Sequence, residues 1–261
     1  MTSIVFPGQG SQTVGMAKDF YDNFKIARII FEEIEEYTRL DLRKIIFENE
    51  ENKLNLTQFT QISIFTASYV IFKTLDSETD LKNQNINIML GHSLGEYTAL
   101  ACSDKISLKD CSLILKKRGE LMNSAVTPNA TGMAALIGLP ADSVQKIIDS
   151  NNLELEIAND NSEIQIVISG KIEDLKNSKE IFLNNDIKKF VLLNVSAAFH
   201  SNYMNDAQKK LAEEINKLKF KENSIKIISN YDAKIYNNNI LIKKNLQNQM
   251  ANKVNWTQSI K

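Results

Sequence analysis

One stretch decides the fold: Asn87-Ile88-Met89-Leu90-Gly91-His92-Ser93-Leu94-Gly95-Glu96-Tyr97-Thr98-Ala99. Its apolar residues 88–90 form a run that is too short for a helix, which predicts a buried strand. Gly91 and Gly95 then bracket Ser93 in the pattern G-x-S-x-G, and residues 94–101 are compatible with a helix. The stretch therefore predicts a strand, a tight turn with the Ser93 hydroxyl at its tip, and a helix.

The spacing within this turn has a physical reason. Glycines at positions 91 and 95 remove side chains that would collide where the strand and the helix approach each other. The backbone N–H of Leu94, at the helix N-terminus, then points toward the space in front of the hydroxyl, which is half of an oxyanion hole. An ordinary strand-to-helix turn with a capping serine is the alternative interpretation.

Composition narrows the class of protein. The chain has 261 residues, of which 43% are hydrophobic, and a formal net charge of -1, which suits one or two globular domains. The charge balance argues against nucleic acid or a membrane surface as the main partner. We expect no signal peptide, and no apolar run approaches the ~18 residues of a membrane span. Cys102 and Cys111 lack metal-ligand spacing, so we expect buried thiols, no metal site and a cytoplasmic protein.

A glycine-rich loop follows the first predicted strand, residues 3–6. The loop Pro7-Gly8-Gln9-Gly10-Ser11-Gln12 leads to a helix from about residue 14. It has neither the G-x-G-x-x-G spacing nor the lysine-hydroxyl pair of a phosphate-binding loop. We therefore expect its backbone N–H groups to face a reaction centre, with Gln9 as the candidate.

The middle of the chain has a different order of elements from its two ends. Helices are predicted over residues 25–36, 40–47, 59–75 and 107–125, and after residue 200 over 205–218 and 241–250, with a strand at 225–229 and a further element from 254. The pattern breaks at residues 126–132. Strands at 133–137, 155–158, 164–169 and 188–194 and helices at 141–150 and 172–184 then follow in the order β-α-β-β-α-β of a ferredoxin-like subdomain. We expect an α/β protein with an α/β-hydrolase-like catalytic domain (1–126 and 196–261) and a ferredoxin-like subdomain (127–195).

Arg118 lies on the apolar face of its predicted helix, one turn after Ile114 and one turn before Leu121. A snorkelling side chain or a buried salt bridge would explain a cation there. In a functional interpretation, the planar guanidinium group would bind a substrate carboxylate through two parallel hydrogen bonds.

The chain has only two histidines, which limits the choice of a base for Ser93. His92 precedes the serine in the turn, so we expect its side chain to support the turn rather than to reach the hydroxyl. His200 follows a predicted strand and is the candidate base. No aspartate is an obvious third member, because Asp142, Asp149, Asp160, Asp174 and Asp186 all lie in the predicted insertion; a backbone or amide carbonyl could orient the imidazole instead.

Together these residues resemble the malonyl-CoA:acyl carrier protein transacylases of bacterial type II fatty acid synthesis, relatives of the acyltransferase domains of polyketide synthases. The matches run along the whole chain: Phe6-Pro7-Gly8-Gln9-Gly10-Ser11-Gln12 with Val14-Gly15-Met16, Gly91-His92-Ser93-Leu94-Gly95-Glu96-Tyr97, Arg118-Gly119, Phe199-His200-Ser201 followed by Met204, and Val254-Asn255-Trp256-Thr257.

The resemblance implies a ping-pong transfer of malonyl from malonyl-CoA to the phosphopantetheine thiol of acyl carrier protein. It implies that Ser93 is the nucleophile, His200 the general base, and the N–H groups of Gln9 and Leu94 the oxyanion hole. Arg118 would bind the malonyl carboxylate. A buried arginine is costly to desolvate unless it meets an anion, so acyl groups without a second carboxylate should be rejected.

Further expectations follow from the same resemblance. The backbone carbonyl of Gln249 would orient His200, and His92, Phe199 and Met122 would line the pocket. Phe199 also favours malonyl, because related domains with phenylalanine before the histidine use malonyl. The enzyme would need no cofactor and would act as a monomer. Family members usually continue for several tens of residues past the Trp-Thr motif, so part of a sheet edge and of a cleft wall would be missing here.

Three rival interpretations remain open. The same chemistry could serve a polyketide assembly line. A serine esterase or thioesterase would use water as the acceptor, although Arg118 and the ferredoxin-like insertion argue against it. A non-catalytic module that binds carrier protein is the third, although the complete set of Ser93, His200 and Arg118 argues for catalysis.

Overall fold

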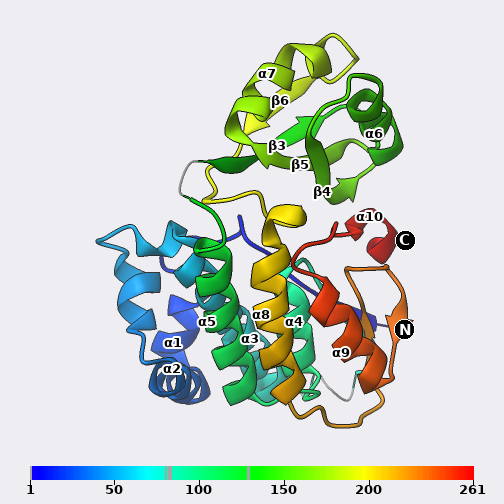
Figure 1. Cartoon of the computed structure of the whole chain (residues 1–261). Helices are drawn as coiled ribbons and strands as arrows, with labels where there is room; N and C mark the ends of the chain where they lie inside the picture. Colours follow the sequence, from blue (N-terminus) through cyan, green and yellow to red (C-terminus); the bar gives the residue numbers. More distant parts are fainter. Residues whose placement is uncertain (1, 80, 82–83, 128–129) are drawn as a thin grey trace.

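Two four-stranded sheets organise the chain. The computed structural model describes residues 2–79, 81, 84–127 and 130–261 (Figure 1). The first sheet has the order β1-β2-β7-β8, made of β1 (Thr2–Phe6), β2 (Ile86–Gly91), β7 (Lys226–Ile228) and β8 (Ile235–Tyr236). The second has the order β4-β5-β3-β6, made of β4 (Leu155–Ser162), β5 (Gln165–Lys171), β3 (Thr131–Ile137) and β6 (Lys189–Leu192). The two sheets therefore draw on different parts of the chain.

The first sheet is parallel at its centre. β1 and β7 both pair parallel to β2, with Ile4 opposite Met89 and Met89 opposite Ile227, whereas β8 is antiparallel to β7. Five of the six residues of β2 are buried, as is typical of a parallel strand covered on both faces. The carboxyl ends of β1 and β2 thus lie side by side, which brings the loop after Phe6 next to the turn after Gly91.

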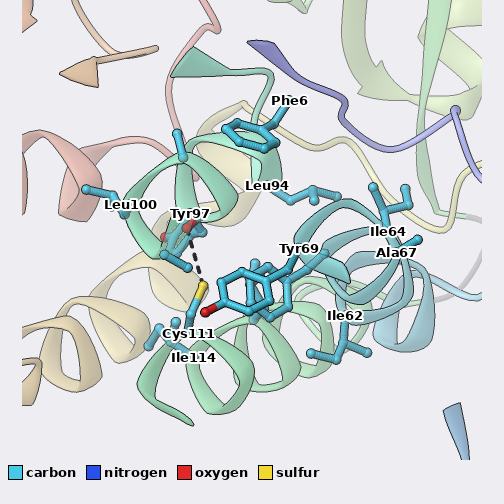
Figure 2. Close-up of a cluster of buried hydrophobic side chains, with 14 of the residues drawn as sticks. Phe6, Ile62, Ile64, Ala67, Tyr69, Leu94, Tyr97, Leu100, Cys111 and Ile114 are labelled. Atoms are coloured by element: carbon cyan, nitrogen blue, oxygen red, sulfur yellow. Dashed lines mark hydrogen bonds between the residues drawn. The ribbon is translucent and has the colours of Figure 1, made fainter. Parts of the chain in front are cut away.

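Helices pack around this first sheet. They are α1 (Lys18–Asn23), α2 (Lys25–Thr38), α3 (Thr57–Thr79), α4 (Leu94–Cys102), α5 (Leu108–Asn123), α8 (Asn205–Lys217) and α9 (Asn239–Asn248). The short helix α10 (Trp256–Ile260) lies against β4 of the second sheet (Figure 1). Every residue of α4 is buried, and its Leu94 and Tyr97 pack with side chains of α3 and α5 (Figure 2). The Cys111 thiol donates to the Tyr97 carbonyl within this cluster at 3.3 Å. The helix that follows Ser93 is therefore anchored in the main core.

The second sheet is antiparallel throughout, and α6 (Ala141–Ser150) and α7 (Ile172–Leu183) cover one of its faces. Alternate residues of β3 face opposite ways, as expected in a strand. Ala134 and Leu136 pack with α6 and α7, whereas Met133 and Ala135 belong to the main core. The other face of this sheet is therefore turned toward the first sheet and its helices, which lie below it in Figure 1.

The predicted α/β fold class is confirmed, but several boundaries differ. The helix expected from about residue 14 begins at Lys18, because Gly15 and Ala17 adopt φ values of 83° and 60°. Residues Lys44–Glu48 form a π-helix, closed by the Asn49 N–H that donates to the Lys44 carbonyl, where an α-helix over 40–47 was expected. Strand β8 was not predicted.

Other differences concern element ends. α3 extends to Thr79 into the loop expected over 76–87, of which residues 80 and 82–83 lie outside the described residues. β4 continues to Ser162 beyond the strand expected over 155–158. The predicted break at 126–132 includes residues 128–129, which also lie outside the described residues. The division of the chain at 127 and 195 stays a prediction.

Residues 2–79, 81, 84–127 and 130–261 contain neither a candidate membrane span nor a cluster of metal-ligating side chains. None of the helices in those ranges combines the length and the apolar character needed to cross a membrane. In the same ranges, no group of three or more histidine, cysteine, aspartate or glutamate side chains is arranged to hold a metal ion.

Candidate active site

The turn between β2 and α4 holds Ser93 in a strained backbone conformation. Its φ is 53° and its ψ is −105°, which few non-glycine residues adopt. The flanking glycines allow the close approach that this turn needs. A Cβ on Gly91 would lie 2.1 Å from the carbonyl carbon of Gly95, and a Cβ on Gly95 would lie 2.6 Å from the carbonyl oxygen of Phe6. The steric reason expected from the G-x-S-x-G spacing therefore holds in the structure.

The Ser93 hydroxyl is paired with His200, 107 residues later in the chain. The Ser93 Oγ lies 2.8 Å from the His200 Nε2. On the other side of the ring, Nδ1 lies 3.1 Å from the carbonyl oxygens of both Gln249 and Asn252. Since carbonyl oxygens only accept, Nδ1 carries the proton and Nε2 is free to accept one from Ser93. The imidazole is thus held in the tautomer of a general base.

Arg118 reaches the same hydroxyl from helix α5. Its side chain is 1% exposed, and Nη2 donates to the Ser93 Oγ at 2.9 Å and to the Gln249 Oε1 at 3.0 Å. Nη1 donates to the Gln61 Oε1 at 2.6 Å. These three acceptors are neutral groups, and burial lowers the pKa of the guanidinium. A buried cation whose hydrogen bonds go to neutral acceptors is a strong site for an incoming anion.

These groups line one cavity of about 300 Å³, which lies between the part of the fold built on the first sheet and the part built on the second. Its lining includes all the site residues expected from the sequence except Gln249: Gln9, His92, Ser93, Leu94, Arg118, Met122, Phe199 and His200. Leu94 is the first residue of α4, so its N–H has no carbonyl one turn earlier to bind. The second sheet adds Met133, Ala135 and Val167 as an apolar wall.

Comparison with known proteins assigns the family. Residues 4–261 match the family model described as the acyl transferase domain. This chain belongs to the acyl transferase family. It is 34% identical over 263 residues to the malonyl CoA-acyl carrier protein transacylase of Bacillus subtilis strain 168, an alignment that covers 99% of this chain and 81% of that protein. The resemblance inferred from the sequence is therefore confirmed.

Two solved structures share the fold of this acyl transferase. The acyl-carrier-protein-S-malonyltransferase from Bartonella henselae superposes with a TM-score of 0.94 and 33% identity, over 100% of this chain and 84% of that one. A malonyl-transacylase solved in complex with its type II polyketide synthase acyl-carrier protein superposes with a TM-score of 0.93 and 30% identity, over 99% of this chain and 83% of that one.

The His92 side chain pairs with Asn161 and Trp256 in this acyl transferase. Its Nε2 lies 2.9 Å from the Asn161 Oδ1, and its ring packs edge-on against Trp256 with centroids 5.2 Å apart. A Cβ on Gly8 would lie 2.7 Å from the His92 carbonyl oxygen, so the glycine-rich loop packs directly on this residue. The side chain lines the cavity, and its support of the turn stays a prediction.

Sequence reasoning missed part of the acyl transferase site. Asn230 accepts the Ser93 N–H on its Oδ1 at 2.6 Å, and Asn252 shares the His200 Nδ1–H with Gln249. A signal for Asn230 did exist. It lies two residues after the end of β7, beside β2, and site residues often follow the carboxyl ends of neighbouring parallel strands. Asn252 follows a helix in a turn and has no comparable signal.

The pH dependence of the acyl transferase should reflect how His200 is buried. Burial and the charge of Arg118 lower its pKa from an ordinary 6.5 to about 3. The base works in its neutral form, which is populated above the pKa, so the acylation rate should not fall as pH drops through 6.5. We expect a flat single-turnover rate from about pH 8 to about pH 5, measured by quenched-flow mass spectrometry. A decline with a midpoint near 6.5 would contradict it.

Proposed function

We propose that this chain transfers malonyl from malonyl-CoA to the phosphopantetheine thiol of acyl carrier protein through a malonyl ester on Ser93. The single observation that carries the proposal is the hydrogen bond of buried Arg118 to the Oγ of Ser93, which places a cation beside the nucleophile. Relatives named for malonyl transfer to acyl carrier protein support the choice of substrate and partner.

The first half-reaction would begin with the hydrogen bond already present. Ser93 Oγ attacks the thioester carbonyl carbon while its proton passes to the His200 Nε2. The backbone N–H groups of Gln9 and Leu94 stabilise the oxyanion. The tetrahedral intermediate collapses by breaking the carbon–sulfur bond, and the CoA thiolate takes the proton from His200. The carrier-protein thiol then reverses these steps and regenerates free Ser93.

Arg118 would select the acyl group during these steps. Its two terminal nitrogens can bind both oxygens of the malonyl carboxylate in a bidentate pair. Phe199 and Met122 would limit the space around the methylene carbon, because both line the cavity. An acetyl group would leave the guanidinium without an anion. The transfer as written uses only groups of the chain, the malonyl thioester and the acceptor thiol, so it requires no cofactor.

The proposal has a wider setting. In this proposal the protein is a cytoplasmic monomer that supplies malonyl units for fatty acid elongation. Its catalytic domain spans residues 1–126 and 196–261, and a ferredoxin-like subdomain spans residues 127–195. The similarity to a polyketide synthase malonyl-transacylase supports a second candidate, in which the same transfer serves polyketide synthesis. The two candidates differ in the carrier protein, not in the chemistry at Ser93.

Intact-protein mass spectrometry tests the reaction directly. After brief mixing with malonyl-CoA we expect one malonyl adduct, and with acetyl-CoA a much slower or no adduct. Adding phosphopantetheinylated acyl carrier protein should remove the malonyl group and produce malonyl carrier protein. Steady CoA release without an adduct would instead indicate a thioesterase, and equal labelling by both thioesters would remove the argument from Arg118. A fatty acid and a polyketide carrier protein, compared at equal concentration, separate the two settings.

A further inference from the structure

Glu96 is a buried carboxyl group to which the proposed mechanism gives no role. It lies in α4, three residues after Ser93, and its side chain is 1% exposed. Its Oε2 accepts from the Asn230 N–H at 3.1 Å and from the Gln249 Nε2 at 2.7 Å. Its Oε1 has no hydrogen-bond partner among the described residues. One oxygen of Glu96 therefore holds two groups that each reach the active site.

The first of these groups fixes the backbone of the nucleophile. The Asn230 side chain accepts the Ser93 N–H at 2.6 Å and donates to the Gly91 carbonyl at 2.9 Å, so it spans the strained turn. Because the Ser93 N–H is already bound, it does not serve the oxyanion, and the N–H of Leu94 is left for that task. Glu96 holds Asn230 in place through the backbone N–H of that residue.

The second group links the nucleophile to the cation. The Gln249 Nε2 donates to Glu96 and also to the Ser93 carbonyl at 2.9 Å, while its Oε1 accepts from Arg118 at 3.0 Å. An amide has one donating end and one accepting end, whereas the Oε2 of Glu96 acts here only as an acceptor. Glu96 therefore determines which end of Gln249 faces Arg118. With the amide reversed, two donors would face each other.

We propose that Glu96 is a positioning residue for acyl transfer, which sets the Ser93 turn through Asn230 and the Arg118 guanidinium through Gln249. The inference rests on the proposed function for its substrate. The position of the accepting oxygen, rather than the charge, carries the effect. Burial raises the pKa of Glu96 to about 7, and Oε2 can accept whether or not a proton sits on Oε1.

Three substitutions separate position from charge. Glu96→Gln keeps an accepting oxygen at the same distance along the side chain and removes the charge. Glu96→Asp keeps the charge and withdraws the oxygens by one methylene. Glu96→Leu removes both. Thr98→Val is the matched control, because Thr98 is equally buried on α4 and its hydroxyl has no hydrogen-bond partner among the described residues.

We expect Glu96→Gln and Thr98→Val to acylate with malonyl-CoA within about threefold of wild type. Glu96→Asp and Glu96→Leu should lose about tenfold or more, since small misplacements of reacting groups have large effects on rate. Their ratio of kcat/KM for malonyl-CoA over acetyl-CoA should fall as well, because Gln249 no longer fixes Arg118. A role in folding alone would lower the folded fraction but leave this ratio unchanged.

Two results would overturn the inference. The first is a Glu96→Gln variant that is as impaired as Glu96→Asp, since charge would then matter more than position. The second is an Asp or Leu variant with wild-type rate and selectivity per folded molecule. If the Leu variant does not fold, the Gln and Asp pair still decides. A fluorophosphonate probe, from which Ser93 displaces fluoride, measures the reactivity of the Ser93 hydroxyl without any thioester. A wrong substrate assignment is therefore distinguishable from a wrong role for Glu96.

Discussion

Replacing Ser93 with alanine should abolish the covalent malonyl adduct and lower transfer to carrier protein by about 10⁴-fold or more. The reason is that Ser93 supplies the only atom to which His200 is hydrogen-bonded through Nε2 in the described site. Without the hydroxyl, the first half-reaction has no acceptor for the acyl group, and the second has no acyl-enzyme to donate it. Intact-protein mass spectrometry measures the adduct, and the formation of malonyl carrier protein measures transfer.

Ser103→Ala is a suitable control for this experiment. Ser103 is also buried, directly follows α4, and binds the Leu100 carbonyl through its hydroxyl, away from the cavity. We expect the control to keep its adduct and a transfer rate close to wild type. An adduct that persists on Ser93→Ala would place the nucleophile elsewhere and remove the basis of the mechanism.

Replacing Arg118 with methionine should lower kcat/KM for malonyl-CoA by about 10²- to 10³-fold, as expected for the loss of one partner of a buried charge pair. Acetyl-CoA should lose far less, because its acyl group never meets the guanidinium. Methionine keeps much of the buried volume and removes the charge and the hydrogen bonds to Gln61, Ser93 and Gln249. Initial rates with the two thioesters give the selectivity directly.

Two further variants make the Arg118 experiment sharper. Arg118→Lys keeps a positive charge but loses the planar fork, so its malonyl activity should lie between those of wild type and Arg118→Met. Lys117→Met removes an exposed charge from the same helix and should change either rate by less than about twofold. Wild-type selectivity in Arg118→Met would show that another group binds the carboxylate.

Local patterns were enough to predict the principal groups of the site. The turn around Ser93 follows from glycine spacing, and His200 follows because the chain has only two histidines. Arg118 is identified by its place on an apolar helix face. Each of these inferences depends on a short stretch of sequence and on one chemical requirement. The carbonyl of Gln249 came instead from the family resemblance, because a backbone group has no sequence signal of its own.

The supporting network could not be predicted in the same way. Glu96 lies in a helix beside glycine, where a glutamate is ordinarily exposed, and only the packing of α4 buries it. Its partner Asn230 lies 134 residues away in sequence. The fold shows the same limit: long periodic helices were predicted, whereas the π-helix at Lys44–Glu48 and the two-residue strand β8 depend on tertiary contacts.

Side chains alternate along β3 between the cavity and the contact with α6 and α7, so a substitution on one face need not disturb the other. Met133 and Ala135 face the cavity, and the nucleophile, base and cation all come from other segments of the chain. A larger or smaller residue at position 135 would change the space in this cavity, while Ala134 and Leu136 would still pack with α6 and α7. The shape of the cavity can therefore change at β3 without any change in the segments that carry Ser93, His200 and Arg118.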